Sequence, residues 1–209
     1  MAKVKICGIT NMEDALLCEE VGAHALGFNF YPKSPRYITP ENARVIVEAL
    51  TGSVLTIGVF VDAKLDEIAD IARTAGLGAV QLHGNETREF ARQVRDDLNI
   101  PVIKAFRVSA DFKPEGVLEF DVDAILLDAY STYIHGGTGE TFDWEIARKV
   151  REIFPKMYLA GGLSPANVHS AIKEITPYAV DACSSLEISP GNKDTEKVRF
   201  FIEEARRND

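Results

Sequence analysis

Two residues that could transfer protons stand at the ends of short apolar runs. Cys7 ends the run 4–7 just before Gly8, and Asp128 follows the run 124–127. In α/β proteins, catalytic groups lie where strands meet the loops that follow them. A thiolate at Cys7 could remove a proton, and a partly desolvated carboxyl group at Asp128 could donate one. Each residue also has a structural alternative, because a free Cys is often inert and buried and an Asp here can cap a helix or form an ion pair.

Three polar side chains are candidates for substrate contacts. Arg36 lies in the loop 31–37, which two prolines stiffen, and its guanidinium could hold a carboxylate through two N–H groups. The alternative is that Arg36 belongs to a charged loop exposed to solvent and has no ligand. We interpret Lys33 in this second way. Gln81 and His83 share one face of a predicted strand, so both could line the site. His83 could instead simply cap that strand.

Loops containing glycine or serine could bind a phosphate group. Gly161 and Gly162 stand at the end of the apolar run 157–161, and Ser184 and Ser185 follow the run 179–183. A third loop, residues 136–139, contains Gly137. Backbone N–H groups in such loops can surround a phosphate. Glycine pairs also serve tight turns, so their position after a late strand is what favours binding.

Short apolar runs alternate with amphipathic segments along the chain. The runs predict strands at 3–8, 25–30, 54–61, 78–83, 101–106, 123–128, 157–161 and 179–184. Helical patterns lie near 11–21, 40–50, 64–75, 86–97, 109–119, 143–153, 165–175 and 193–206, with expected helix starts at Pro40, Asp143 and Pro165. Eight strand–helix units in 209 residues indicate an α/β protein with a single (β/α)8 TIM barrel spanning 1–209. A doubly wound sheet is the alternative, but it needs fewer units.

The composition narrows the range of partners and compartments. The net charge of −9 argues against nucleic acid and anionic membranes as partners. No apolar run approaches the roughly 18 residues that span a membrane. Residues 1–3 lead directly into the first predicted strand, so we expect no signal peptide. The three cysteines cannot all pair, which favours a reducing cytoplasm, and neither they nor the histidines have metal-ligand spacing.

The motifs together resemble the phosphoribosylanthranilate isomerase family of tryptophan biosynthesis. The resemblance covers almost the whole chain in order, through KICGIT (5–10), GFNFYPKSPRYI (27–38), IGVF (57–60), VQLHG (80–84), IKAF (103–106), LLDA (126–129), GGTGETFDW (136–144), LAGGLSPANV (159–168) and AVDACSSLEISPGNKD (179–194). It implies that Cys7 is the general base, Asp128 the general acid, and Arg36 the residue that binds the anthranilate carboxylate. The implied phosphate site includes Gly161, Gly162 and Ser184, and we add Ser185 and Gly137 as further contacts.

The implied reaction is an Amadori rearrangement of a phosphorylated aminoaldose, for which we expect neither a metal nor another cofactor. A homodimer is a possible assembly. Two rivals remain: an isomerase of phosphosugars without the aromatic amine, and a non-catalytic barrel that only binds ligands. The former would give Arg36 no obvious partner. The latter would not need both Cys7 and Asp128.

The segment after the eighth predicted strand departs from the family, which usually reads DVSSGVE there. Ser185 replaces a glycine, and it would be strained if that position has a positive φ. Cys183 stands where Ser is usual and could approach Cys7 closely enough for a reversible disulfide, although it could also be only a packing residue. Strand alternation further predicts that Lys5 points into the barrel and contacts Asp181.

Overall fold

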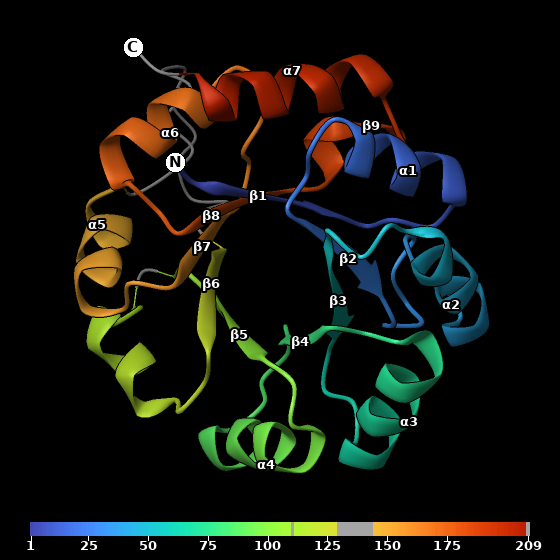
Figure 1. The fold of residues 1–209 in the computed structure, drawn as a ribbon. Helices are drawn as coiled ribbons and strands as arrows, with labels where there is room; N and C mark the ends of the chain where they lie inside the picture. Colours follow the sequence, from blue (N-terminus) through green and yellow to red (C-terminus); the bar gives the residue numbers. More distant parts are fainter. Residues whose placement is uncertain (110, 129–143, 208–209) are drawn as a thin grey trace.

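The computed structural model describes residues 1–109, 111–128 and 144–207. Within them, eight parallel strands form a closed barrel in the order β1 to β8, and β8 pairs with β1. Figure 1 shows this ring of strands with the helices arranged around its outside. The predicted (β/α)8 barrel is confirmed.

The strands lie where the apolar runs predict them. Almost every strand residue is buried, because one face lines the barrel interior and the other packs under the helices. The strands are β1 (Lys3–Cys7), β2 (Ala25–Asn29), β3 (Leu55–Phe60), β4 (Ala79–Leu82), β5 (Val102–Arg107), β6 (Ala124–Asp128), β7 (Met157–Ala160) and β8 (Ala179–Ala182).

Several helices begin at side chains that cap them. Asn11 accepts the N–H of Asp14 before α1, and Thr39 accepts the N–H of Asn42 before α2, whose first residue is the expected Pro40. The α-helices are α1 (Met12–Glu20), α2 (Pro40–Ala49), α3 (Leu65–Ala75), α4 (Arg88–Leu98), α5 (Trp144–Ile153), α6 (Val168–Ile175) and α7 (Thr195–Arg206).

Two predicted helices differ from the structure. The fifth, expected at 109–119, is a 3₁₀ helix, η1 (Pro114–Glu119), because the proline prevents the preceding residues from continuing a helix into it. The helix expected from Pro165 begins at Val168, since Ser164 and Asn167 close a turn before it. The expected start at Asp143 lies outside the described residues.

A short insertion between β8 and α7 was not predicted. It contains the 3₁₀ helix η2 (Ser184–Leu186) and an antiparallel hairpin of β9 (Glu187–Ser189) and β10 (Asn192–Lys193). Asp194 then caps α7 by accepting the N–H groups of Glu196 and Lys197. The hairpin follows the carboxyl end of β8, so it lies at the end of the barrel where the candidate site is expected.

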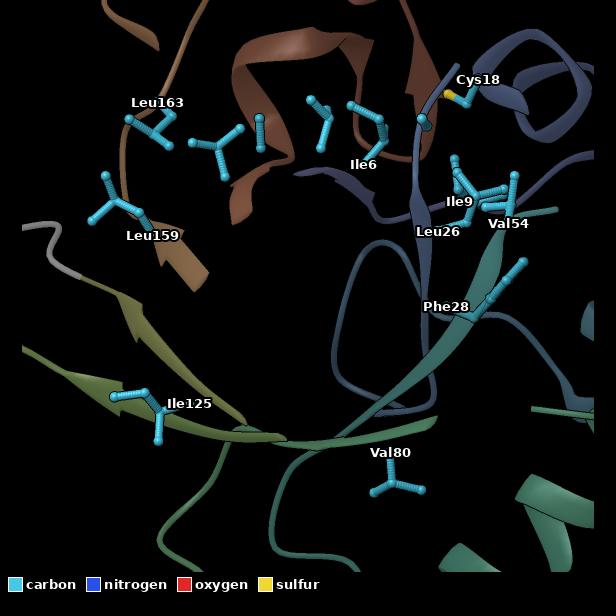
Figure 2. Packing of buried hydrophobic residues seen from close by; sticks show 14 of the residues in the cluster. Ile6, Ile9, Cys18, Leu26, Phe28, Val54, Val80, Ile125, Leu159 and Leu163 are labelled. Carbon is cyan, nitrogen blue, oxygen red and sulfur yellow. The ribbon is translucent and has the colours of Figure 1, made fainter. Parts of the chain in front are cut away.

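Buried apolar side chains form two clusters on opposite faces of the strands. The larger cluster fills the layer between barrel and helices, and Figure 2 shows members of it such as Phe28, Val80 and Leu159. The smaller cluster, which includes Ile57 and Leu126, lies on the other face of the strands. In the part of the chain that is described, no helix combines the length and apolar character needed to cross a membrane.

Candidate active site

A cavity of about 880 Å³ opens at the carboxyl ends of the strands. It brings together nearly all of the predicted site residues, from segments spread between β1 and η2. Those that line it are Cys7, Arg36, Gln81, His83, Asp128, Gly161, Gly162, Ser184 and Ser185. Gly137 lies outside the described residues.

The end of β1 places Cys7 on the inner face, above Lys5. Gly27 of β2 is the register partner of Cys7. A Cβ at Gly27 would lie 2.7 Å from Cys7 Sγ and 3.2 Å from Lys5 Nζ. The missing side chain at Gly27 therefore makes room for both the thiol and the ammonium group.

Lys5 and Asp181 form the predicted contact inside the barrel. Lys5 Nζ donates a hydrogen bond to Asp181 Oδ1 at 2.9 Å, and both side chains are buried. Burial alone would lower the pKa of Lys5, but the charges of Asp181 and Cys7 outweigh it and leave the pKa raised. Burial raises the pKa of Asp181 to about 7, against the opposing effect of the Lys5 charge. Lys5 therefore supplies a permanent positive charge beneath Cys7.

Cys7 is the more acidic of two neighbouring thiols. A hydrogen bond with Cys183 holds the pKa of Cys7 well below its usual range; burial opposes this, and the charges of Lys5 and Lys193 add to the lowering. The same hydrogen bond and burial raise the pKa of Cys183. Cys7 is therefore the thiol that ionises, as a proton-abstracting base requires.

Asp128 ends β6 and lies near an imidazole from the end of β4. His83 Nε2 is 3.6 Å from Asp128 Oδ2, and Gln81 Nε2 is 2.7 Å from His83 Nδ1. When the Gln81 amide donates to Nδ1, the neutral His83 carries its proton on Nε2, facing Asp128. Gln81 Oε1 is buried without a hydrogen-bond partner among the described residues. Gln81 thus orients the imidazole toward the carboxyl group.

The guanidinium of Arg36 is held by a carboxylate from the unpredicted hairpin. Arg36 Nε donates to Glu187 Oε1 at 2.8 Å, and Nη2 donates to Oε2 at 2.6 Å. Burial would raise the pKa of Glu187, but hydrogen bonds from Arg36 and Lys193 leave it lowered. Lys193 Nζ also donates to the carbonyl oxygen of Cys7 at 2.6 Å. One buried ionic network therefore connects Arg36 to the backbone of Cys7.

The loops after β7 and β8 form another wall of the cavity. Gly161 and Gly162 have φ values of 90° and 72°, which strongly favour glycine at both positions. Ser185 does not have a positive φ, so the strain considered for it is not present. Its hydroxyl donates to the carbonyl oxygen of Leu163 at 2.5 Å. This bond joins the two loops predicted to hold a phosphate.

Sequence reasoning missed several charged residues of the site. Arg107 and Lys33 line the cavity. From the sequence, we interpret Lys33 as only solvated, which misses its place at the site. Arg107 is the register partner of Asp128, but the fifth strand was predicted to end one residue earlier. Glu187 and Lys193 come from the hairpin, which no periodic pattern in the sequence predicts. Across the described residues, no group of three or more His, Cys, Asp or Glu side chains is arranged to hold a metal ion.

Comparison with known proteins identifies close relatives over the full chain. A family model described as N-(5'phosphoribosyl)anthranilate (PRA) isomerase matches residues 4–204. The N-(5'-phosphoribosyl)anthranilate isomerase of Geobacter sp. (strain M21) is 51% identical over 207 residues, covering 99% of each chain.

Solved structures agree with this match. A crystal structure of phosphoribosyl anthranilate isomerase in complex with reduced 1-(o-carboxyphenylamino)-1-deoxyribulose 5-phosphate has a TM-score of 0.87 at 45% identity, covering 99% of each chain. A crystal structure of mutually generated monomers of the dimeric enzyme from Thermotoga maritima has a TM-score of 0.86 at 44% identity, also covering 99% of each chain. Because the family model spans nearly the entire barrel and a full-length relative shares half of its residues, this chain belongs to the N-(5'-phosphoribosyl)anthranilate isomerase family.

Proposed function

We propose that this enzyme converts N-(5-phosphoribosyl)anthranilate into 1-(2-carboxyphenylamino)-1-deoxyribulose 5-phosphate, the third step from chorismate to tryptophan. The observation that carries this proposal is the placement of Cys7 and Asp128 at the ends of β1 and β6, where both line one cavity. The two groups belong to different strands of the barrel, so they can act on different atoms of one bound substrate. That arrangement suits an isomerisation, which moves protons without a net change of oxidation state.

Asp128 is the general acid in the proposed mechanism. It gives its proton to the furanose ring oxygen, the C1′–O bond breaks, and the nitrogen lone pair forms a Schiff base. The carboxylate that remains faces His83 Nε2 at 3.6 Å, and Gln81 fixes the orientation of that imidazole. The N–H of His83 can therefore stabilise the carboxylate formed by ring opening.

Cys7 is the general base of the second step. Its thiolate removes the proton at C2′, and the electron pair of the C–H bond neutralises the Schiff base to give an enolamine. The enolamine then tautomerises to the ketone. The buried positive charges of Lys5 and Lys193 favour the thiolate before this step and so keep the base ready for it.

The remaining cavity residues hold the two anionic ends of the substrate. Arg36 binds the anthranilate carboxylate, with its guanidinium oriented by Glu187. The phosphate lies on the loops after β7 and β8, where Gly161, Gly162, Ser184 and Ser185 line the cavity. Gln81 and His83 contact the substrate between these ends, and Gly137 is a further proposed contact that lies outside the described residues.

A fluorescence assay tests the proposed function, because anthranilate derivatives emit and turnover changes the signal. Freshly prepared N-(5-phosphoribosyl)anthranilate should be consumed and the aminoketose should form. Ribose 5-phosphate, which lacks the aromatic amine, should not be isomerised at a comparable rate. Efficient turnover of that sugar alone would favour a general phosphosugar isomerase. Binding of the aminoaldose without turnover would favour a non-catalytic barrel.

We also propose that the enzyme acts in the cytoplasm as a homodimer and takes no nucleic acid or membrane as a partner. A dimeric relative supports the assembly, at 44% identity over nearly the full chain. Light scattering coupled to size-exclusion chromatography tests it. A mass of about 46 kDa, twice that of the 23.0 kDa chain, is expected, and a monomer mass at micromolar concentration would contradict the proposal.

A further inference from the structure

Cys183 lies beside the thiol that the proposed reaction uses as its base. The register of β1 and β8 pairs Ile6 with Ala182, so Cys7 and Cys183 are the next residues along the two neighbouring segments. Both line the same cavity. The second thiol therefore belongs to the active site, although the reaction as proposed above assigns it no role.

The surrounding structure holds Cys183 in this position. A Cβ at Gly8 would lie 2.8 Å from Cys183 Sγ and 2.7 Å from Arg36 Cδ, so only a residue without a side chain leaves space for both. Lys193 Nζ donates to the carbonyl oxygens of Cys7 at 2.6 Å and of Cys183 at 3.4 Å. These bonds tie the two cysteine backbones to one buried ammonium group.

We propose that Cys183 is a positioning residue for catalysis, whose S–H group donates a hydrogen bond to the Cys7 thiolate and keeps that base ionised in the resting enzyme. The inference rests on the proposed function, since it serves proton abstraction by Cys7. A thiol is a weak donor to neutral groups, but hydrogen bonds to ionised acceptors are roughly twice as strong as neutral ones. The donor matters here because burial disfavours a thiolate.

Other charged groups also act on Cys7, and they remain in place when Cys183 is replaced. Lys5 and Lys193 favour the thiolate, as does the Arg36 guanidinium, whereas Asp181 opposes it. His83 and Asp128 face the same cavity from β4 and β6. Glu187 Oε1 is a second acceptor for the Cys183 S–H group, through a long hydrogen bond of 3.8 Å from Cys183 Sγ. A change in the ionisation of Cys7 on substitution of Cys183 therefore reports the loss of the S–H donor.

Alkylation by iodoacetamide measures the ionisation of Cys7 without any substrate, because the thiolate is the form that reacts. The rate is followed against pH, with peptide mapping to separate Cys7 from the other cysteines. Cys183→Ala and Cys183→Val remove the donor, and the Val variant does so at nearly constant volume. Cys183→Ser keeps a hydroxyl donor. Cys18→Ala is the matched control, since it removes a buried thiol of α1 that does not line the cavity.

We expect the alkylation midpoint of Cys7 to move about one pH unit upward in Cys183→Ala and Cys183→Val, a tenfold change in the ionisation constant. The acid limb of kcat/KM should move the same way, while Cys183→Ser and Cys18→Ala stay near wild type. Unchanged midpoints in both donor-free variants, in an enzyme that still isomerises the aminoaldose, would overturn the inference alone. A shifted midpoint in a protein without isomerase activity would instead support the hydrogen bond and remove the proposed function.

Discussion

Lys5 and Asp181 form a buried ion pair at the base of the active-site cavity, with their charged atoms 2.9 Å apart. The two residues are register partners on β1 and β8, where the barrel closes. Lys5 precedes Cys7 by two residues and so shares its face of the strand. Removing one partner of a buried pair leaves an uncompensated charge in the barrel interior, which destabilises the folded protein.

This pair predicts a particular dependence of stability on pH. Burial raises the pKa of Asp181 to about 7, whereas an unfolded chain has Asp near its ordinary value of about 4. Between these values the folded protein holds a proton that the unfolded chain has lost, so the contribution of Asp181 to the free energy of unfolding falls as pH rises from about 4 to about 7. The Asp181→Asn variant has no ionisable group at position 181, so it lacks this contribution between about pH 4 and about pH 7. Urea unfolding across this range should show wild type losing stability relative to the variant, and two parallel curves would contradict the prediction.

The two proton-transfer residues should each be required for turnover. Cys7→Ala and Asp128→Asn are expected to lower kcat by at least about 100-fold, the lower range for general acid–base catalysis. Both side chains lie at the mouth of the barrel, so circular dichroism should show intact folding. Cys18→Ala is the control for simple loss of a thiol, and it should keep most of the activity. A near wild-type kcat in either active-site variant would show that its assigned role is wrong.

Arg36 should act mainly on binding. Its proposed carboxylate partner lies away from the reacting carbons, so the contact is similar in the ground and transition states. Arg36→Ala should raise KM by roughly 10- to 100-fold, the range for a lost hydrogen bond to a charged group, with a smaller change in kcat. Arg44→Ala, which removes an exposed helix ion pair with Glu48, is the matched control. An unaltered KM, or a loss confined to kcat, would count against the assignment.

The barrel and its inward-facing residues could be predicted because both follow a regular repeat. Apolar runs set the strands, alternation sets which side chains face inward, and closure brings β8 beside β1. These rules were sufficient for the Lys5–Asp181 contact and for the gathering of Cys7 and Asp128 around one cavity. Each of these conclusions needs only the strand positions and the direction of the chain.

The support of Arg36 could not be predicted, because it comes from an element outside that repeat. Glu187 and Lys193 lie on a short antiparallel hairpin whose two- and three-residue strands have no detectable period. Arg107 was missed for a different reason. The fifth strand was predicted to end at residue 106, one residue before Arg107, which pairs with Asp128 at the site. Ser185 is a third case. It replaces a glycine of the family, and strain was expected there if the position had a positive φ. The backbone at Ser185 does not adopt a positive φ, so that strain is absent.

The neighbouring thiols also predict sensitivity to oxidation. Adjacent residues on paired strands lie about 4.8 Å apart, within the Cα separation that a disulfide spans. The acidic thiol of Cys7 should react first with diamide, and the Cys183 thiol should then displace the adduct, so that both thiols lose their hydrogens to the azo compound and form an S–S bond.

We therefore expect diamide to inactivate wild type and dithiothreitol to restore its activity. Cys183→Ser cannot form the bond and should be less sensitive at equal diamide concentration. Non-reducing peptide mapping should find a linked peptide containing Cys7 and Cys183 in wild type alone. Cys18→Ala should behave as wild type, because the buried Cys18 thiol has its pKa raised to about 12 by burial and is a poor nucleophile. Equal sensitivity of wild type and Cys183→Ser, with no linked peptide, would leave Cys183 as a hydrogen-bond donor without a redox role.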